Sequence, residues 1–197
     1  MAIGTTSAFG QEKFNTQGRI GLHTGVGFGI HLLSTNQIAD KDVGGLTGNL
    51  RLGVDYGFTN WLTGGLVLFR NGFATDKDCN ERASIGGVGV YAHFNFARRP
   101  KTTWYAGFGL GVSGLTYENF NNQGKATTSG SYQTLYLGFR RYFGDHFGIF
   151  VQAGASGYNY KELKYNSSLL NNATDKKWEM LISGMEIQAG LAVALGK

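Results

Sequence analysis

Four histidines are the residues of this sequence best suited to bind a metal ion or to move a proton: His23, His31, His93 and His146. The ligands of a metal ion must converge on one point. His23 and His31 fall on one predicted strand, about 26 Å apart at the usual rise of a strand. They cannot share an ion, and we expect them to form hydrogen bonds inside the fold. The sequence therefore predicts no metal site and no cofactor.

Serine–histidine pairs are the next candidates for catalysis. In sequence, Ser34 is the serine nearest to His31, and Ser84 is the nearest to His93. A nucleophilic serine needs a histidine base, which an Asp or Glu usually orients. Neither pair has such an acid at a suitable spacing. We therefore do not expect an enzyme. The single cysteine, Cys79, has no partner for an internal disulfide.

Composition restricts the fold that must position these groups. The 197 residues include 32 glycines, and 42% are hydrophobic, 14% aromatic and 16% charged. A helical bundle would not tolerate so much glycine, and a disordered chain would not be so hydrophobic. The net charge is +5, but Arg98–Lys101 is the only basic cluster, so we do not expect nucleic-acid binding. One all-β domain remains.

Apolar and polar residues alternate in most of the chain, as they do on the two faces of a strand. From 19 to 32 the even positions are mainly aliphatic, and the odd positions are Gly, His and Arg. The same alternation occurs in 46–58, 87–96, 104–113, 133–140, 147–156 and 181–196. Segment 61–70 is apolar at both parities, so its faces cannot be assigned. These patterns predict eight strands.

Connector lengths suggest how these strands are joined. Long polar connectors (33–44, 71–84, 117–131 and 161–177) take turns with short ones (59–60, 97–101 and 144–146). Such a succession is typical of an up-and-down barrel whose two ends differ. We predict an all-β fold, an eight-stranded antiparallel transmembrane β-barrel.

The composition of the two faces indicates which one is outside. A soluble lipocalin-like barrel would have its polar face in water, rich in Lys and Glu. Here the polar face is mostly Gly, and the aliphatic face has only Arg141 as an arguable charge. We therefore predict that the aliphatic face contacts lipid. The predicted lipid-facing band comprises Leu50, Leu52, Val90, Phe108, Leu110, Val151 and Leu191.

Aromatic residues near the strand ends predict interfacial girdles. They are Tyr56, Phe58, Trp61, Phe96, Trp104, Tyr142, Phe143, Phe147 and Trp178.

Five charged residues fall on the predicted interior face: Arg19, Arg51, Asp55, Arg140 and Glu186. An unpaired buried charge costs several kcal/mol, so we expect pairing. Arg51 and Glu186 fall near mid-barrel on strands that only one strand separates. We predict that they form the central pair, and that Asp55 bridges Arg19 or Arg140. Tyr91, Tyr105, Tyr136 and Tyr158 would fill the space around them. The lumen would then be plugged.

The alternating strands, the closing segment 190–195 and the turn 141–147 resemble the small eight-stranded outer-membrane barrels of Gram-negative bacteria, such as the OmpA transmembrane domain and OmpX-like proteins. The resemblance covers residues 17–196 and implies periplasmic termini. Ala8-Phe9-Gly10 before Gln11 is similar to the end of a signal peptide, and such a start is similar to exported Bacteroidota proteins. We interpret 1–10 as a signal-peptide remnant and 11–197 as the barrel domain; the alternative is a plain start of the chain.

This resemblance implies a structural or accessory role in the bacterial outer membrane. The expected partners are outer-membrane lipid, lipopolysaccharide and a second outer-membrane protein in a complex. Two alternatives are a narrow pore for small solutes and a lipid A-modifying enzyme.

Overall fold

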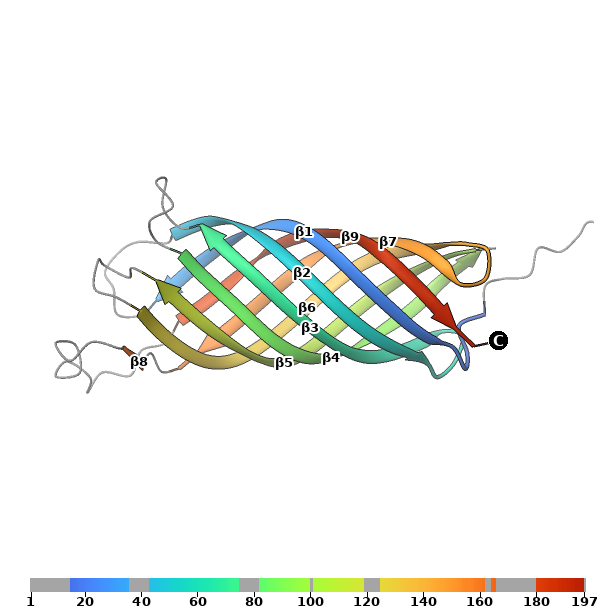
Figure 1. Cartoon of the computed structure of the whole chain (residues 1–197), viewed down its shortest axis with the longest axis horizontal. Coiled ribbons are helices and arrows are strands. Elements are labelled where there is room, and N and C mark those ends of the chain that lie inside the picture. Colours follow the sequence, from blue (N-terminus) through green and yellow to red (C-terminus); the bar gives the residue numbers. More distant parts are fainter. Residues whose placement is uncertain are drawn as a thin grey trace, which may run out of the picture.

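The computed structural model describes residues 15–35, 43–74, 82–99, 101–118, 125–161, 164–165 and 180–196. Within these ranges no helix is long and apolar enough to cross a membrane. The predicted signal-peptide remnant (1–10), Cys79 and Trp178 lie outside the described residues. The strands, shown in Figure 1, are β1 (Ile20–Thr35), β2 (Val43–Gly57), β3 (Leu62–Ala74), β4 (Arg82–Arg99), β5 (Thr102–Glu118), β6 (Lys125–Phe143), β7 (Phe147–Tyr160), β8 (Lys164–Tyr165) and β9 (Met180–Leu195).

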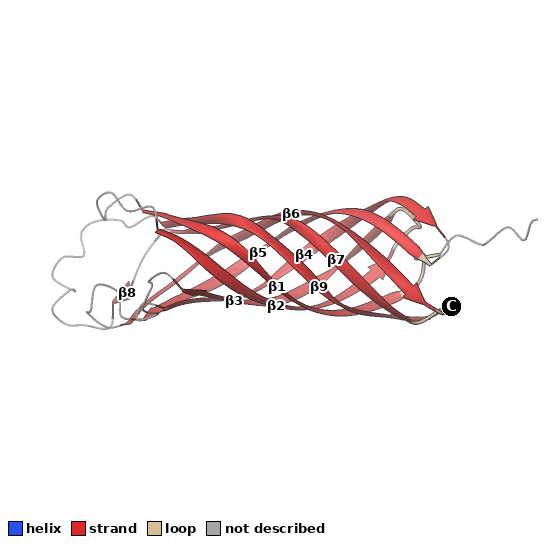
Figure 2. Ribbon diagram, turned by 90° about the horizontal axis from the view of Figure 1, so that it is seen from above, coloured by secondary structure: helices blue, strands red, loops and turns tan. Residues whose placement is uncertain are grey.

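Eight of these strands form a closed antiparallel barrel. They neighbour one another in the order β5-β4-β3-β2-β1-β9-β7-β6, and pairing of β5 with β6 closes the ring. The two-residue β8 pairs only with β6, at the barrel's rim. Figure 2 shows the strands crossing both walls of one elongated cylinder. The predicted fold is therefore confirmed.

The two ends of the barrel differ. The β2–β3, β4–β5 and β6–β7 connections lie at one end, together with the last described residues of the chain (Figure 1). We call this the short-turn end. The opposite end is the long-connector end, where β1, β3, β5 and β7 finish.

The strands are longer than the alternation predicted. The predicted connector 117–131 is mostly strand, because β5 pairs with β6 from Thr102↔Arg141 to Glu118↔Lys125. Residues 125–131 are mostly polar at both parities, so the alternation of a half-buried strand is absent there. Backbone pairing in a closed barrel does not need this alternation, because the neighbouring strands satisfy the backbone hydrogen bonds whatever the side chains are.

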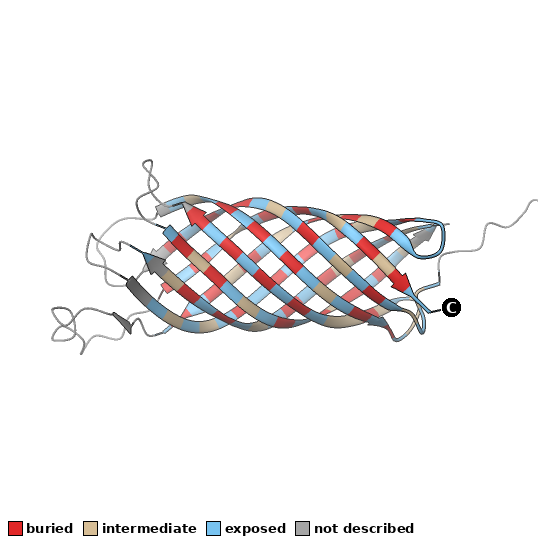
Figure 3. Ribbon diagram, in the orientation of Figure 1, coloured by how far each residue is buried: buried red, intermediate tan, exposed pale blue. Residues whose placement is uncertain are grey.

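Buried and exposed residues alternate along every barrel strand, as Figure 3 shows. Val26 is 65% exposed and Leu137 is 63% exposed, whereas the neighbouring Tyr136 is 8% exposed. Of the predicted lipid-facing band, Val151 is half-buried and the other six side chains are exposed on the outer face. The aliphatic face therefore lies outside.

Strand β3 resolves the segment whose faces the sequence left open. Val67, Phe69 and Asn71 are buried inside, and Leu68 and Arg70 are exposed outside. The outer face therefore has a charge at Arg70 that the alternation could not assign.

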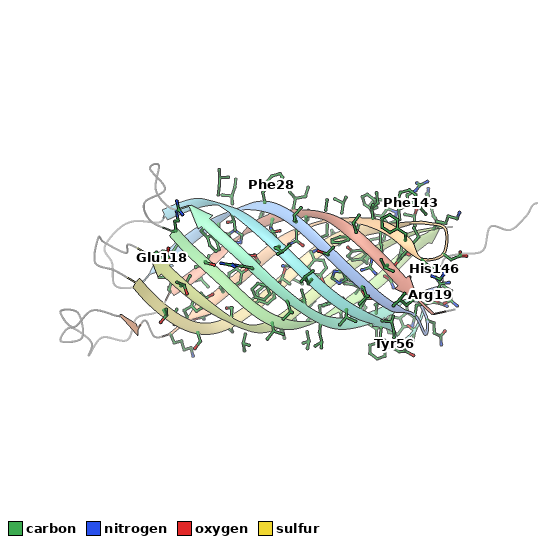
Figure 4. The ribbon with its side chains drawn as sticks, viewed as in Figure 1. Arg19, Phe28, Tyr56, Glu118, Phe143 and His146 are labelled. Carbon is green, nitrogen blue, oxygen red and sulfur yellow. The ribbon has the colours of Figure 1, made fainter. Side chains whose placement is uncertain are left out.

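Aromatic side chains surround the short-turn end on the outside. Tyr56, Phe58, Trp61 and Phe147 are exposed there, and Figure 4 shows Tyr56 and Phe143 pointing away from the barrel near this end. Tyr142 is a correction: it is 3% exposed and points inward. Its even position places it on the inner face of β6, together with Arg140.

Candidate functional site

The centre of the lumen contains an ion pair. The Arg51 guanidinium donates through Nη2 to Glu186 Oε1 at 2.6 Å and to the Tyr132 hydroxyl at 2.7 Å. Arg51 lies on β2 and Glu186 on β9, on either side of β1. The structure thus brings together the two residues predicted as the central pair. β1 presents Gly27 between them, where a Cβ would overlap the Ile187 carbonyl oxygen and the side chains of Asn49 and Gln188.

A chain of side-chain amides extends from this pair. Asn49 Nδ2 donates to Glu186 Oε2 at 3.3 Å, and Gln188 Nε2 donates to Asn49 Oδ1 at 2.8 Å. Gln152 Nε2 donates to Gln188 Oε1 at 2.7 Å, and the Tyr105 hydroxyl donates to Gln152 Oε1 at 3.1 Å. The network therefore crosses the lumen from β5 to β2. The sequence prediction missed all three amides, although each has the parity of the inner face.

A second polar cluster lies nearer the short-turn end. Asp55 Oδ2 lies 3.2 Å from Arg140 Nη2 and accepts a hydrogen bond from the Tyr91 hydroxyl at 3.2 Å. His23 Nε2 is 2.7 Å from that hydroxyl. Of the two predicted partners of Asp55, the structure has Arg140 as the ion-pair partner. Arg19 instead donates through Nη1 to the Asp145 carbonyl in a short turn, at 2.8 Å. Figure 4 shows Arg19 at this end of the barrel.

An apolar layer fills the lumen toward the long-connector end. Phe69 packs on Tyr132 with ring centroids 4.2 Å apart, and Tyr132 stacks on Tyr158 at 5.3 Å. Of this layer the sequence prediction had placed only Tyr158 in the lumen, because the inner positions of most strands are polar or glycine. The buried residues of the layer are Leu33, Phe69, Phe73, Ala83, Ile85, Leu115, Tyr132, Tyr158, Tyr160, Met180 and Ile182.

The histidines lie inside or at the end of the barrel as hydrogen-bonding groups. His31 Nδ1 is 2.7 Å from Thr47 Oγ1, and its Nε2 is 2.9 Å from Ser156 Oγ. His93 Nε2 is 2.8 Å from the Tyr136 hydroxyl. Among the described residues no group of three or more His, Cys, Asp or Glu side chains could hold a metal ion.

Of the two serines that the sequence suggested, Ser84 is described in full, and the side chain of Ser34 lies outside the described residues. Ser84 has the outward parity of β4, whereas His93 is buried in the lumen. Ser156 contacts His31 instead, but both are nearly inaccessible, with 4% and 2% exposure. The partner of the other ring nitrogen is a threonine and not a carboxylate. This pair therefore lacks both substrate access and the orienting acid of a serine hydrolase.

The cavities found between the lumen side chains of the described residues are small. The cavity beside Arg51, Tyr105 and Gln152 has a volume of about 10 Å³, which is close to the minimum for one water molecule. Two further cavities near the short-turn end measure about 20 and 10 Å³. Glycines make this packing possible: a Cβ at Gly107 would overlap the ring of Tyr136.

Comparisons with known proteins support the fold. No protein-family model matches the sequence, and no curated protein is similar to it. Neisserial surface protein A has 12% identity and a TM-score of 0.55, over 87% of this chain and 96% of its own. OprG from Pseudomonas aeruginosa has 14% identity and a TM-score of 0.51, over 92% of this chain and 98% of its own. The outer membrane protease OmpT from Escherichia coli also matches, at 9% identity and a TM-score of 0.47, over 92% and 98%. At these identities the likeness to Neisserial surface protein A and OprG is one of fold.

The closed barrel, its exposed apolar outer surface and its polar central network together define the class of protein. Closed barrels are one of only two structures that satisfy all backbone hydrogen bonds within a membrane. The chain has the fold of the integral outer-membrane β-barrels, with eight strands, an exposed apolar outer surface and a polar interior.

Proposed function

We propose that this barrel is a closed, non-conducting body with a structural or accessory role in the outer membrane. The observation that carries the proposal is the continuous filling of the lumen. The Asp55–Arg140 cluster, the Arg51–Glu186 network and the apolar layer follow one another from the short-turn end to the long-connector end. A solute would have to displace all three.

Displacing the central pair has a high free-energy cost. Arg51 and Glu186 have side chains that are 95% buried, and separating a buried ion pair by removing one partner typically costs about 3–5 kcal/mol. The apolar layer adds a second barrier, because any water column would have to pass between packed aromatic rings. A narrow pore is therefore the less favoured function.

A barrel with a filled lumen interacts with other molecules through its outer wall and its connectors. We propose that the long-connector end is extracellular and that both chain ends are periplasmic, as in barrels with short periplasmic turns and longer outer loops. In this orientation the outer wall contacts lipid and any neighbouring membrane protein.

Solute permeation tests the closure. Purified protein is reconstituted into liposomes, and swelling is followed in an iso-osmotic solution of a small sugar. We expect the swelling rate of protein-free liposomes, with a known porin as the positive control. Swelling that increases with the amount of folded barrel would establish the pore instead.

A pull-down tests the accessory role. The native protein is extracted in mild detergent and its neighbours are quantified. An outer-membrane protein recovered in a fixed ratio supports the accessory role. Recovery of the barrel without any such neighbour contradicts it and leaves the structural role.

A further inference from the structure

The outer wall has a hollow near its long-connector end. It has a volume of about 580 Å³ and spans β2, β3, β4 and β5, which lie side by side in Figure 1. We call it the outer hollow. Gly48, Gly72 and Ser84 line it, together with Arg70, Arg82 and Glu118. Figure 4 shows Glu118 at this end of the barrel.

The glycines of the outer hollow have no packing reason within the chain. A Cβ at Gly48 or Gly72 would meet no atom within 4 Å. Gly86 and Gly114 lie outside the lining of the outer hollow, on its strands β4 and β5, and a Cβ at either would meet only backbone oxygens at 3.8 Å or more. Gly48 pairs with Gly72 and Gly86 pairs with Gly114 across neighbouring strands. Glycine weakens a strand, and it often marks a place where a ligand approaches the backbone closely.

Positive charge lies beside this glycine floor. Arg70 is exposed on the outer face, after the lipid-facing Leu68 on β3 and opposite Leu50 on β2. A lipid-facing Arg costs about 2–4 kcal/mol at the midplane and about 0–1 near the interface. Arg70 therefore fits the upper border of the apolar band, where lipid headgroups begin.

A second arginine, Arg82, lies closer to the long-connector end than Arg70. Arg82 pairs with Ala74, four residues beyond Arg70 on β3, which places the two backbone positions about 13 Å apart along the strand direction. Glu118 faces Arg82 on β5. The three charges leave the outer hollow with a net positive charge.

A second depression of the outer wall, the apolar groove, lies closer to the short-turn end on the same strands. It has a volume of about 610 Å³, and its lining includes Leu52, Val54, Leu66, Leu68 and Val88. The two depressions share β2, β3 and β4. Leu66 and Leu68 thus line the groove directly before Arg70 of the outer hollow on the same strand. The outer hollow and the apolar groove thus follow one another along these strands in the same order as the headgroup and the acyl chains of a lipid.

We propose that the outer hollow and the apolar groove bind one lipopolysaccharide molecule through its lipid A. The phosphates contact Arg70 and Arg82, and the sugar rings lie over Gly48 and Gly72. The acyl chains occupy the apolar groove. A phosphorylated disaccharide carries two phosphates that can reach two separated arginines, whereas a common phospholipid has a smaller headgroup with one phosphate. This proposal rests on the membrane location and the orientation of the proposed function, and not on closure of the lumen. Lipid retention tests the lipid site, and solute permeation tests the closure.

Lipid retention by the full-length protein tests this proposal. The folded barrel in detergent is titrated with purified lipopolysaccharide, and the bound lipid is counted by native mass spectrometry. We expect one retained molecule per barrel. In the R70Q/R82Q variant we expect retention weaker by at least about tenfold, the effect of losing one charge-assisted contact. R141Q is the matched control, because Arg141 is an exposed arginine at the opposite end of the same outer face.

A second variant tests the shape of the site. Gly72→Val places a branched side chain in the outer hollow, and its Cβ meets no atom of the chain within 4 Å, so we expect normal folding and weakened retention. Enzymatic removal of the lipid A phosphates should weaken retention by the wild type. Three results overturn the proposal: unchanged retention by R70Q/R82Q, an equal loss in R141Q, or equally tight retention of phosphatidylglycerol.

Discussion

Arg51 and Glu186 allow the filled lumen to be tested by a double-mutant cycle. The variants are Arg51→Ala, Glu186→Gln and the double substitution. In the wild type the two side chains are joined by a hydrogen bond of 2.6 Å between buried groups. Removing the arginine leaves the Glu186 carboxylate with the Asn49 amide at 3.3 Å. Such a loss should lower the free energy of unfolding by about 4 kcal/mol, within the usual range for a broken buried pair.

Glu186→Gln should cost less, about 2 kcal/mol. The glutamine has the same size, and Arg51 retains the Tyr132 hydroxyl at 2.7 Å. Once Arg51 is gone, neutralising Glu186 should cost almost nothing. The double variant should therefore be about as unstable as Arg51→Ala alone, which gives a coupling energy of about 2 kcal/mol.

Urea unfolding in lipid vesicles measures these free energies. The exposed Trp61 and Trp104 report the loss of lipid contact through their fluorescence. A control cycle pairs Glu186→Gln with Leu137→Ala, since Leu137 is 63% exposed on the outer face, and it should be additive within about 0.5 kcal/mol. A coupling energy between Arg51 and Glu186 that is also below about 0.5 kcal/mol would refute the buried pair.

Three further predictions test the faces, the packing and the orientation. Leu110→Arg should impair folding into vesicles by up to about 2–4 kcal/mol, as measured by urea titration; normal insertion would mean that the faces are wrongly assigned. Gly107→Ala should destabilise the barrel because its methyl group overlaps Tyr136, whereas Gly72→Ala should be neutral or stabilising; equal thermal stabilities of these two variants would contradict a tightly packed lumen. Cys79, in the connection between β3 and β4, should react with a membrane-impermeant thiol reagent on whole cells; reaction only after the outer membrane is permeabilised would invert the proposed orientation.

The face of each strand could be predicted from the sequence where the two parities differ in polarity. Val90 and Leu110 lie on the outer face and Tyr91 and Tyr105 on the inner face, because successive side chains point to opposite faces whatever the tertiary structure. Segment 61–70 could not be read in this way. Its inner positions Phe69 and Val67 are as apolar as its outer ones, since they pack against other lumen side chains.

The lumen network could be predicted only in part. Parity and position along the strand suggested that Arg51 and Glu186 lie at the same level. Which arginine contacts Asp55 depends on the stagger of the strands around the barrel, and the alternation does not contain this information. The amides of Gln152 and Gln188 were missed for the same reason, because their partners lie on neighbouring strands whose register is set by closure of the ring.

The alternation of polar and apolar residues also could not predict where the strands begin and end. β6 begins at Lys125, in a polar stretch that pairs with β5 through its backbone. The outer hollow lies in the part of the wall near the long-connector end, where glycine, serine and threonine replace many of the apolar outer residues. Its glycines are identified as unusual only when the space around each one is known.

Single-channel recording in a planar lipid bilayer tests the filled lumen most directly. Folded wild-type protein is added to one side, and insertion is verified independently by protease protection of the recovered membrane. We expect no steady current above the bare bilayer, because the buried ion pair and the apolar layer both close the lumen. A steady conductance on the nanosiemens scale that appears with each inserted barrel would contradict it.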